Sequence, residues 1–161
     1  MKKGYIWVGM LILLVLVACG QGGNTPTSGS EGEEEMEQIK EWSYEVETVQ
    51  KDNELHVTMT VSNHLEKASE IEFSSGQQYE LIIRDESDEV LYRYSEGKMF
   101  TMAIMIEQLS PGESLTFSEA IPLDGIDSGQ YELEAKLLIV SIDGNEPEDG
   151  MFKKEERVEI N

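Results

Sequence analysis

The chain has 161 residues, 33 of them acidic and 12 basic, so its formal net charge is −21 at pH 7. This length suits one domain with an appendage. The strong negative charge argues against a nucleic-acid partner, because a phosphate backbone would be repelled. The only cysteine, Cys19, can form neither an internal disulfide nor a thiolate zinc cage.

The N-terminal 18 residues have the pattern of a bacterial export signal. Lys2 and Lys3 supply a positive start, and residues 5–18 are almost entirely apolar. This apolar stretch is shorter than the about 20 residues that a transmembrane helix needs. It leads into residues 16–20, Leu-Val-Ala-Cys-Gly. This sequence resembles the lipobox of bacterial lipoproteins.

The lipobox resemblance implies that the Cys19 thiol receives a diacylglyceryl group and that cleavage makes Cys19 the mature N-terminus. Two acyl chains give stable membrane anchoring. We therefore expect residues 1–18 to be a lipoprotein signal peptide. The protein would then lie on the extracytoplasmic face of the cell membrane, held by its lipid anchor. The alternative is an ordinary cleavable signal followed by a chance cysteine.

Residues 19–40 contain the expected lipidated cysteine and an acidic tether. The sequence after Cys19 is rich in Gly, Ser and Thr and then acidic, with five glutamates between Glu31 and Glu37. Such a segment buries too little apolar surface to offset the entropy of ordering, so we expect it to be disordered. Its charge would also be repelled by anionic headgroups. Calcium binding by the glutamates is the alternative to a solvated spacer.

From about Trp42 onward, apolar and polar residues alternate with a period of two, which is typical of strands with one buried face. The clearest apolar series is Leu55, Val57, Met59 and Val61. Similar runs occur at residues 71–73, 79–83, 90–94, 115–117, 131–139 and 158–160. Turn-forming residues separate them at 51–53, 75–76, 85–88, 111–112, 127–129 and 143–145.

This pattern predicts an all-β fold for residues 41–161, without a convincing amphipathic helix. Strands with one apolar face need a second apolar surface, which two antiparallel sheets packed face to face provide. We therefore expect an immunoglobulin-like β-sandwich of about eight antiparallel strands. A small barrel is the structural alternative. The expected core positions include Val57, Phe117, Leu133 and Leu137.

No catalytic or cofactor motif is found in the sequence, so we expect neither an enzyme nor a bound cofactor. The two histidines, His56 and His64, are expected at the surface rather than in a catalytic pair. Residues 143–149 are loosely similar to a calcium-binding loop. However, Pro147 takes the place of a ligand and the glycine at the sixth loop position is missing, so no metal site is expected.

Four segments carry a resemblance to a known family. They are residues 73–80 (FSSGQQYE), 90–100 (VLYRYSEGKMF), 109–114 (LSPGES) and 129–131 (GQY). Their order and spacing resemble the BsuPI family, named for an intracellular proteinase inhibitor of bacilli. The resemblance covers roughly residues 55–140. It implies an immunoglobulin-like all-β domain and, for the founding members, inhibition of a cytosolic subtilisin-like serine protease.

The chain differs from the family pattern in two ways. Tyr94 stands where the family leads us to expect tryptophan, a conservative change within a core. The lipobox sends the chain outside the membrane, away from any cytosolic protease. Two functions therefore remain open: a membrane-anchored proteinase inhibitor with a protein partner, and an envelope accessory or binding module without inhibitory or enzymatic activity.

Residues of the matched segments also have structural interpretations. Gly76 is expected to form a tight turn, because glycine accepts a positive φ without penalty. Pro111 and Gly112 fit the middle of a type II turn. Tyr92 and Tyr94 share a strand face and are expected to contribute to the core.

Any protease contact is expected to run through residues 94–102. The stretch 95–98 carries turn chemistry, and the large apolar side chains that follow it suit the apolar primary pocket of subtilisin-like enzymes. The competing interpretation places Phe100 in the core, out of reach of a partner. The candidate partner-binding residues are Tyr94, Ser95, Gly97, Lys98, Met99 and Phe100.

Residues 98–106 (KMFTMAIMI) form the most apolar stretch after residue 40. We expect this stretch to be a buried strand covered on both faces. If it is exposed instead, its methionines would mark an interaction surface, since methionine adapts to varied partners.

Overall fold

The computed structural model describes residues 41–161. The expected signal peptide, the Cys19 anchor and the acidic tether all lie outside these residues. Ten strands are present in the described part of the chain: β1 (Trp42–Lys51), β2 (Glu54–Asn63), β3 (Ser69–Phe73), β4 (Tyr79–Arg84), β5 (Val90–Arg93), β6 (Met105–Leu109), β7 (Ser114–Pro122), β8 (Gly129–Leu137), β9 (Ile139–Ile142) and β10 (Lys153–Ile160).

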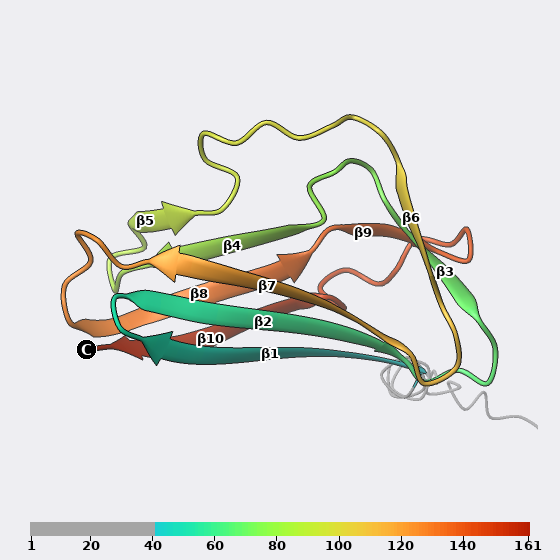
Figure 1. Cartoon of the computed structure of the whole chain (residues 1–161), viewed down its shortest axis with the longest axis horizontal. Helices are drawn as coiled ribbons and strands as arrows, with labels where there is room; N and C mark the ends of the chain where they lie inside the picture. Colours follow the sequence, from blue (N-terminus) through green and yellow to red (C-terminus); the bar gives the residue numbers. More distant parts are fainter. Residues whose placement is uncertain (1–40) are drawn as a thin grey trace, which may run out of the picture. The chain divides into compact units, whose positions relative to one another are not determined.

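The strands form three antiparallel sheets, which confirms the predicted all-β fold (Figure 1). Two larger sheets, with strand orders β1-β2-β7 and β10-β8-β4-β5, make the layers of a sandwich. The third sheet, β6-β3-β9, lies at one end of these layers (Figure 1). The strand count exceeds the expected eight partly because the strand is interrupted at Leu138. The residues before it form β8, and the residues after it form β9, which pairs with β3.

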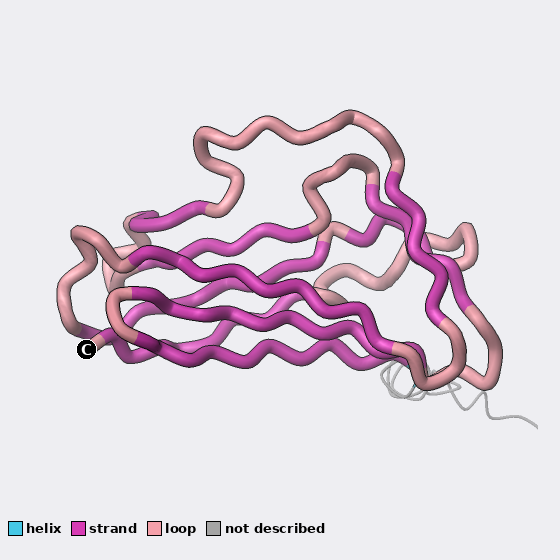
Figure 2. The backbone as a smooth tube through the Cα atoms, in the orientation of Figure 1, coloured by secondary structure: helices cyan, strands magenta, loops and turns pink. Residues whose placement is uncertain are grey.

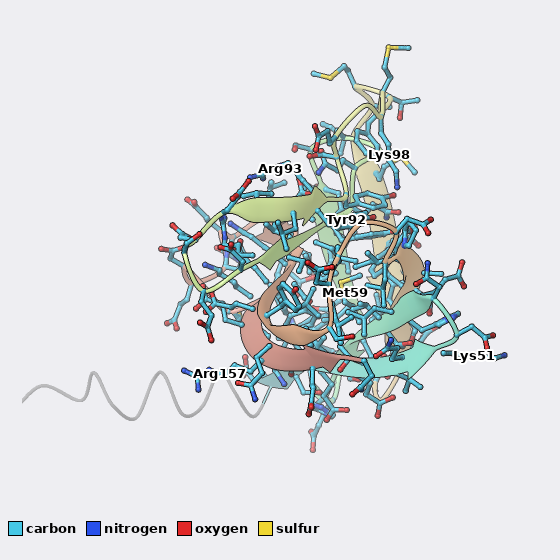
Figure 3. The ribbon with its side chains drawn as sticks, turned by 90° about the vertical axis from the view of Figure 1, so that its left-hand side faces the viewer. Lys51, Met59, Tyr92, Arg93, Lys98 and Arg157 are labelled. Carbon is cyan, nitrogen blue, oxygen red and sulfur yellow. The ribbon has the colours of Figure 1, made fainter. Side chains whose placement is uncertain are left out.

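The core lies between the two larger sheets, as the alternation predicts. The apolar residues of β2 are fully covered, and Met59 lies between the layers in Figure 3. The facing sheet contributes the equally buried Leu81, Ile83, Leu133 and Leu137. Phe117 is only partly buried, because its ring lies at the margin of the core. Within residues 41–161, no helix has the length and apolar composition needed to cross a bilayer.

The predicted turn at Pro111 and Gly112 is confirmed. The Glu113 amide donates to the Ser110 carbonyl at 3.0 Å, which closes a four-residue turn. Gly112 has a φ of 75° at the third position, as a type II turn requires. This turn connects β6 to β7 and so passes the chain from the small sheet to one of the larger layers.

Asn63, at the end of β2, is a fully buried polar residue whose role sequence reasoning missed. Its side-chain amide nitrogen donates to the carbonyl oxygens of Lys67 at 3.0 Å, Leu109 at 2.9 Å and Ser110 at 3.3 Å. Its side-chain oxygen accepts from the Leu65 amide at 2.9 Å. Asn63 therefore ties the β2–β3 loop to the β6–β7 turn.

Asp143, in the tight turn after β9, fastens that turn to the start of β3. One carboxylate oxygen accepts from Lys67 Nζ at 2.7 Å and from Ser69 Oγ at 2.6 Å. The other accepts from the Glu70 amide at 2.9 Å. The hydrogen bond from Lys67, followed by those from Ser69 and Glu70, lowers the pKa of Asp143 to about 2.

These contacts predict a loss of stability in acid. The folded-state pKa of Asp143 lies below its usual value, so its contribution is complete above about pH 4 and falls as the pH approaches 2. In Asp143→Asn, this part of the pH dependence should be absent. Urea denaturation of both proteins between pH 5 and pH 2 measures it, and identical pH profiles would contradict the assignment.

Candidate functional site

The β5–β6 loop (residues 94–104) is the long connection that arches away from the sheets in Figure 2. Of the eight large hydrophobic residues exposed within residues 41–161, four lie in or just after this loop. Their exposed fractions are 98% for Met99, 90% for Met102, 66% for Ile104 and 53% for Ile106. The exposed apolar side chains thus gather in one short segment.

The expected burial of residues 98–106 is therefore wrong. The segment does not form a strand between two neighbours: most of it is loop, and only its end enters β6. Strand β6 is itself an edge strand that pairs with β3 on one side. Phe100 and Met105 are the members that stay partly covered.

The loop begins with a tight turn. The Tyr94 amide donates to the Leu81 carbonyl at 2.9 Å, which extends the pairing of β5 with β4 by one residue. The Lys98 amide then donates to the Ser95 carbonyl at 3.2 Å, and Gly97 has a φ of 70°. The turn chemistry read from residues 95–98 is thus realised in the structure.

A column of five aromatic rings connects the core to the loop. It begins at the buried Phe73, whose ring centroid lies 6.1 Å from that of Phe117. Phe117 lies 5.5 Å from Tyr79, and Tyr79 lies 4.3 Å from Tyr94. The last member, Phe100, lies 5.9 Å from Tyr94. Aromatic pairs at these distances are favourable, so the loop is supported by the core itself.

The Lys98 side chain packs against this column at Tyr94. Its Nζ lies 3.4 Å from the centroid of the Tyr94 ring and 3.3 Å from Oε1 of Glu119 on β7. The other oxygen of Glu119 accepts a hydrogen bond from the Tyr79 hydroxyl at 2.9 Å. Burial, reinforced by Tyr94 and Glu119, raises the pKa of Tyr79 above its usual value, so its hydroxyl remains a donor.

Gly76 fixes the far side of the loop, though not in the way expected from the sequence. Its amide donates to the Thr101 carbonyl at 2.8 Å. Gly76 is not among the glycines with a positive φ, so the expected reason for a glycine here is wrong. A Cβ at this position would lie 2.5 Å from Thr101 Oγ1, which means that the close approach of the two segments favours glycine.

The structure brings together the candidate residues from Tyr94 to Phe100 on this loop, whereas Cys19 lies outside the described residues. Sequence reasoning gave Gly76 a different role and missed the supporting roles of Thr101 and Glu119. Only Gly76 carried any sequence signal, as part of a matched segment. The contact between Glu119 and Lys98 joins strand β7 to the β5–β6 loop, which no local sequence pattern connects.

The supported loop holds Met99 in solvent between two anchored neighbours. Side chains with sulfur atoms project from the loop beyond Lys98 in Figure 3. An apolar group on a segment that is already ordered can enter a partner's pocket with little further loss of entropy. Within residues 41–161, no group of three or more potential ligand side chains is placed to hold a metal ion.

The family model for BsuPI, described as intracellular proteinase inhibitor, matches residues 42–142. This match spans more than half of the chain, and the chain belongs to the BsuPI family. The resemblance noted in the sequence is thereby confirmed, and the match begins earlier than residue 55. An inhibitor family also fits a protein without catalytic activity of its own. No curated protein matches the sequence at a significant level.

Similar solved structures include a penta-heme cytochrome c552 from Thermochromatium tepidum, with a TM-score of 0.41 and 16% identity. The β-glucosidase DesR from Streptomyces venezuelae has a TM-score of 0.38 and 12% identity. The alignments cover 73% and 74% of this chain. This chain spans only 37% of the cytochrome and 15% of the glucosidase. Such low scores support no inference about function.

Proposed function

We propose that this protein is a lipid-anchored, extracytoplasmic inhibitor of a subtilisin-like serine proteinase and that the β5–β6 loop is its contact surface. The proposal rests on the exposure of Met99. This residue is 98% exposed, on a loop that is anchored to the core on both sides. Membership in an inhibitor family supplies the class of partner. The serine type of the proteinase and the extracytoplasmic location are parts of the proposal.

The physical case for this loop is one of pre-organisation. A proteinase binds an extended segment of its partner, and ordering a flexible segment would cost part of the binding free energy. The turn at residues 95–98 and the aromatic column order the segment before binding. An unbranched apolar side chain such as that of Met99 also adapts to the shape of an apolar pocket.

Met99→Asp should weaken inhibition of subtilisin at least about tenfold, because a charge would have to leave water for an apolar pocket. The fold should be unaffected, since the side chain makes no contact that the core needs. Titration of subtilisin with the full chain in detergent solution, using a chromogenic peptide substrate, gives the inhibition constant. Val49→Asp is the matched control, because Val49 is an exposed apolar residue on β1, 63% exposed.

Two results would contradict the loop as the contact surface. One is an inhibition constant that is the same for Met99→Asp and the wild type. The other is equal weakening by Met99→Asp and Val49→Asp, which would point to a general effect of added charge. The thermal unfolding midpoint of each variant shows whether the domain remains folded.

The anchor requires its own test. In Cys19→Ala the thiol that would accept the diacylglyceryl group is absent, so the protein should lose its acylation and leave the membrane fraction. Its domain should unfold at the same temperature as in the wild type, because the acidic tether separates the two. Mass spectrometry of the mature N-terminus is decisive: a wild-type chain with an unmodified Cys19 would remove the lipoprotein assignment.

The lipobox favours a second candidate function, an envelope accessory module without inhibitory activity. The founding inhibitors act on a cytosolic protease, which a chain anchored outside the membrane does not meet. Adding the protein to subtilisin distinguishes the two functions. A stoichiometric loss of subtilisin activity supports inhibition. If subtilisin is unaffected, or simply degrades the domain, the accessory module is favoured.

A further inference from the structure

We propose that Met99–Phe100 is the reactive peptide bond of the inhibitor and that Tyr94 is the positioning residue that holds the chain on both sides of it. This inference rests on the inhibitor function proposed above. It adds the bond that the proteinase attacks and the reason that the bond survives the attack.

On the N-terminal side of the bond, the chain is held in place by contacts of the Lys98 side chain. Its ammonium group lies 3.4 Å from the centroid of the Tyr94 ring, a distance at which cation–π attraction is strong. Glu119 adds an ion pair to the same ammonium group at 3.3 Å. The Lys98 side chain is thereby directed back onto the domain, and the next side chain, that of Met99, is in solvent.

On the C-terminal side, two contacts hold the residues that follow the bond. The Phe100 ring lies 5.9 Å from the Tyr94 ring, centroid to centroid. The Thr101 carbonyl accepts the hydrogen bond from Gly76 at 2.8 Å. Tyr94 therefore contacts the residue before Met99 and the residue after it.

Met102 is the other strongly exposed methionine of the loop, at 90%. Its N-terminal neighbour, Thr101, is held by Gly76, but its C-terminal neighbour, Ala103, is exposed. Of these two methionines in the β5–β6 loop, Met99 is the one that combines nearly full exposure with anchored residues on both sides. This difference assigns the reactive bond to Met99–Phe100 rather than to Met102–Ala103.

The chemistry of a serine proteinase explains why holding both sides matters. The enzyme's serine oxygen bonds to the Met99 carbonyl carbon, and the bond from that carbon to the Phe100 nitrogen breaks. The serine proton passes through the enzyme's histidine to the nitrogen, which leaves an acyl-enzyme and a free Phe100 amine.

In an unsupported loop the Phe100 amine would diffuse away, and water would then hydrolyse the acyl-enzyme. Here, the Tyr94 ring and the Gly76 amide keep the new amino terminus beside the acyl carbonyl. The amine can therefore attack that carbonyl again, which re-forms the peptide bond and returns the proton to the serine. Proximity of this kind strongly favours the intramolecular reaction over hydrolysis.

Tyr94→Leu tests the proposal, since it removes the ring contacts to both Lys98 and Phe100. The full chain in detergent solution is incubated with subtilisin, and mass spectrometry follows the cut between Met99 and Phe100. We expect this cut at least about tenfold faster than in the wild type, because two favourable contacts are lost. Tyr92→Leu, the same change in the partly buried tyrosine two residues earlier, should leave the rate unchanged.

Glu119→Gln provides a milder second variant in case Tyr94→Leu fails to fold. It removes the charge that holds Lys98 and keeps an acceptor for Tyr79, so the cut should be about threefold faster. Inhibition of subtilisin by the wild type is measured in the same samples.

The outcomes distinguish a failure of this inference from a failure of the proposed function. If the wild type inhibits, and the folded variants are cut at the wild-type rate or at another bond, the role of Tyr94 and the assigned bond are overturned while the proposed function stands. If the wild type does not inhibit and is itself cut rapidly at Met99–Phe100, the proposed function fails together with the inference. Faster cutting confined to Tyr94→Leu and Glu119→Gln supports it.

Discussion

Asn63→Asp should destabilise the domain by about 3 kcal/mol or more at pH 7, a large part of the about 5–15 kcal/mol that stabilises a domain. The two side chains have nearly the same shape, so the effect is chemical. A carboxylate oxygen would replace the amide nitrogen that now donates to the carbonyls of Lys67, Leu109 and Ser110. This new oxygen of a buried charge would then face three carbonyl acceptors without a donor, while the other oxygen would keep only the hydrogen bond from the Leu65 amide.

The pH dependence of this variant gives a sharper signature than the loss itself. Burial and the facing carbonyls would raise the folded-state pKa of the introduced carboxyl above its usual value of about 3.9. The protonated form is therefore favoured in the folded state, and the destabilisation grows as the pH rises above about 4 and shrinks below it.

Urea denaturation at pH 7 and pH 4 measures this effect. Asn161→Asp is the control, because its side chain is exposed and the change adds the same charge. An Asn63→Asp protein as stable as the control at pH 7 would contradict the burial of Asn63. A loss of stability that did not change with pH would contradict the assigned hydrogen bonds.

Leu133→Ala should cost about 2–5 kcal/mol of unfolding free energy. Leu133 is fully buried on β8 and lies opposite Ile83 of β4, so truncation removes apolar contacts and leaves a cavity. Glu134 points to the opposite face, where it forms ion pairs with Arg84 at 4.0 Å and Lys153 at 3.6 Å. Because such pairs are partly exposed, Glu134→Ala should cost at most about 1 kcal/mol.

Thermal or urea denaturation of the two variants compares adjacent positions of one strand. The ratio of the two losses in unfolding free energy tests the strand register directly, since a shift by one residue would exchange the two faces of the strand. Equal losses, or a larger loss for Glu134→Ala, would mean that the register of β8 is wrong.

The sequence predicts the sandwich well where a strand has one buried face. The series from Leu55 to Val61 and the series around Leu133 lie in the core because period-two alternation directly reflects burial on one side. The type II turn at Gly112 could be predicted equally well from the sequence, since its geometry requires a positive φ that glycine adopts most readily.

The candidate site was less accessible to sequence reasoning. Apolar composition alone does not distinguish a buried strand from an exposed loop, so residues 98–106 were placed in the core. What orders this loop is a set of contacts between distant positions, such as Gly76 with Thr101 and Lys98 with Glu119. Asn63 was missed for the same reason, because two of its carbonyl partners lie more than 40 residues away.

Hydrogen exchange of the full chain, alone and with subtilisin whose catalytic serine is replaced by alanine, would locate the contact surface. Such an enzyme binds the loop without cutting it. The proposed function predicts that protection on binding is concentrated in residues 94–104 and that the outer face of the β10-β8-β4-β5 sheet is unchanged. Protection elsewhere with an unchanged β5–β6 loop, or no protection at all, would contradict it.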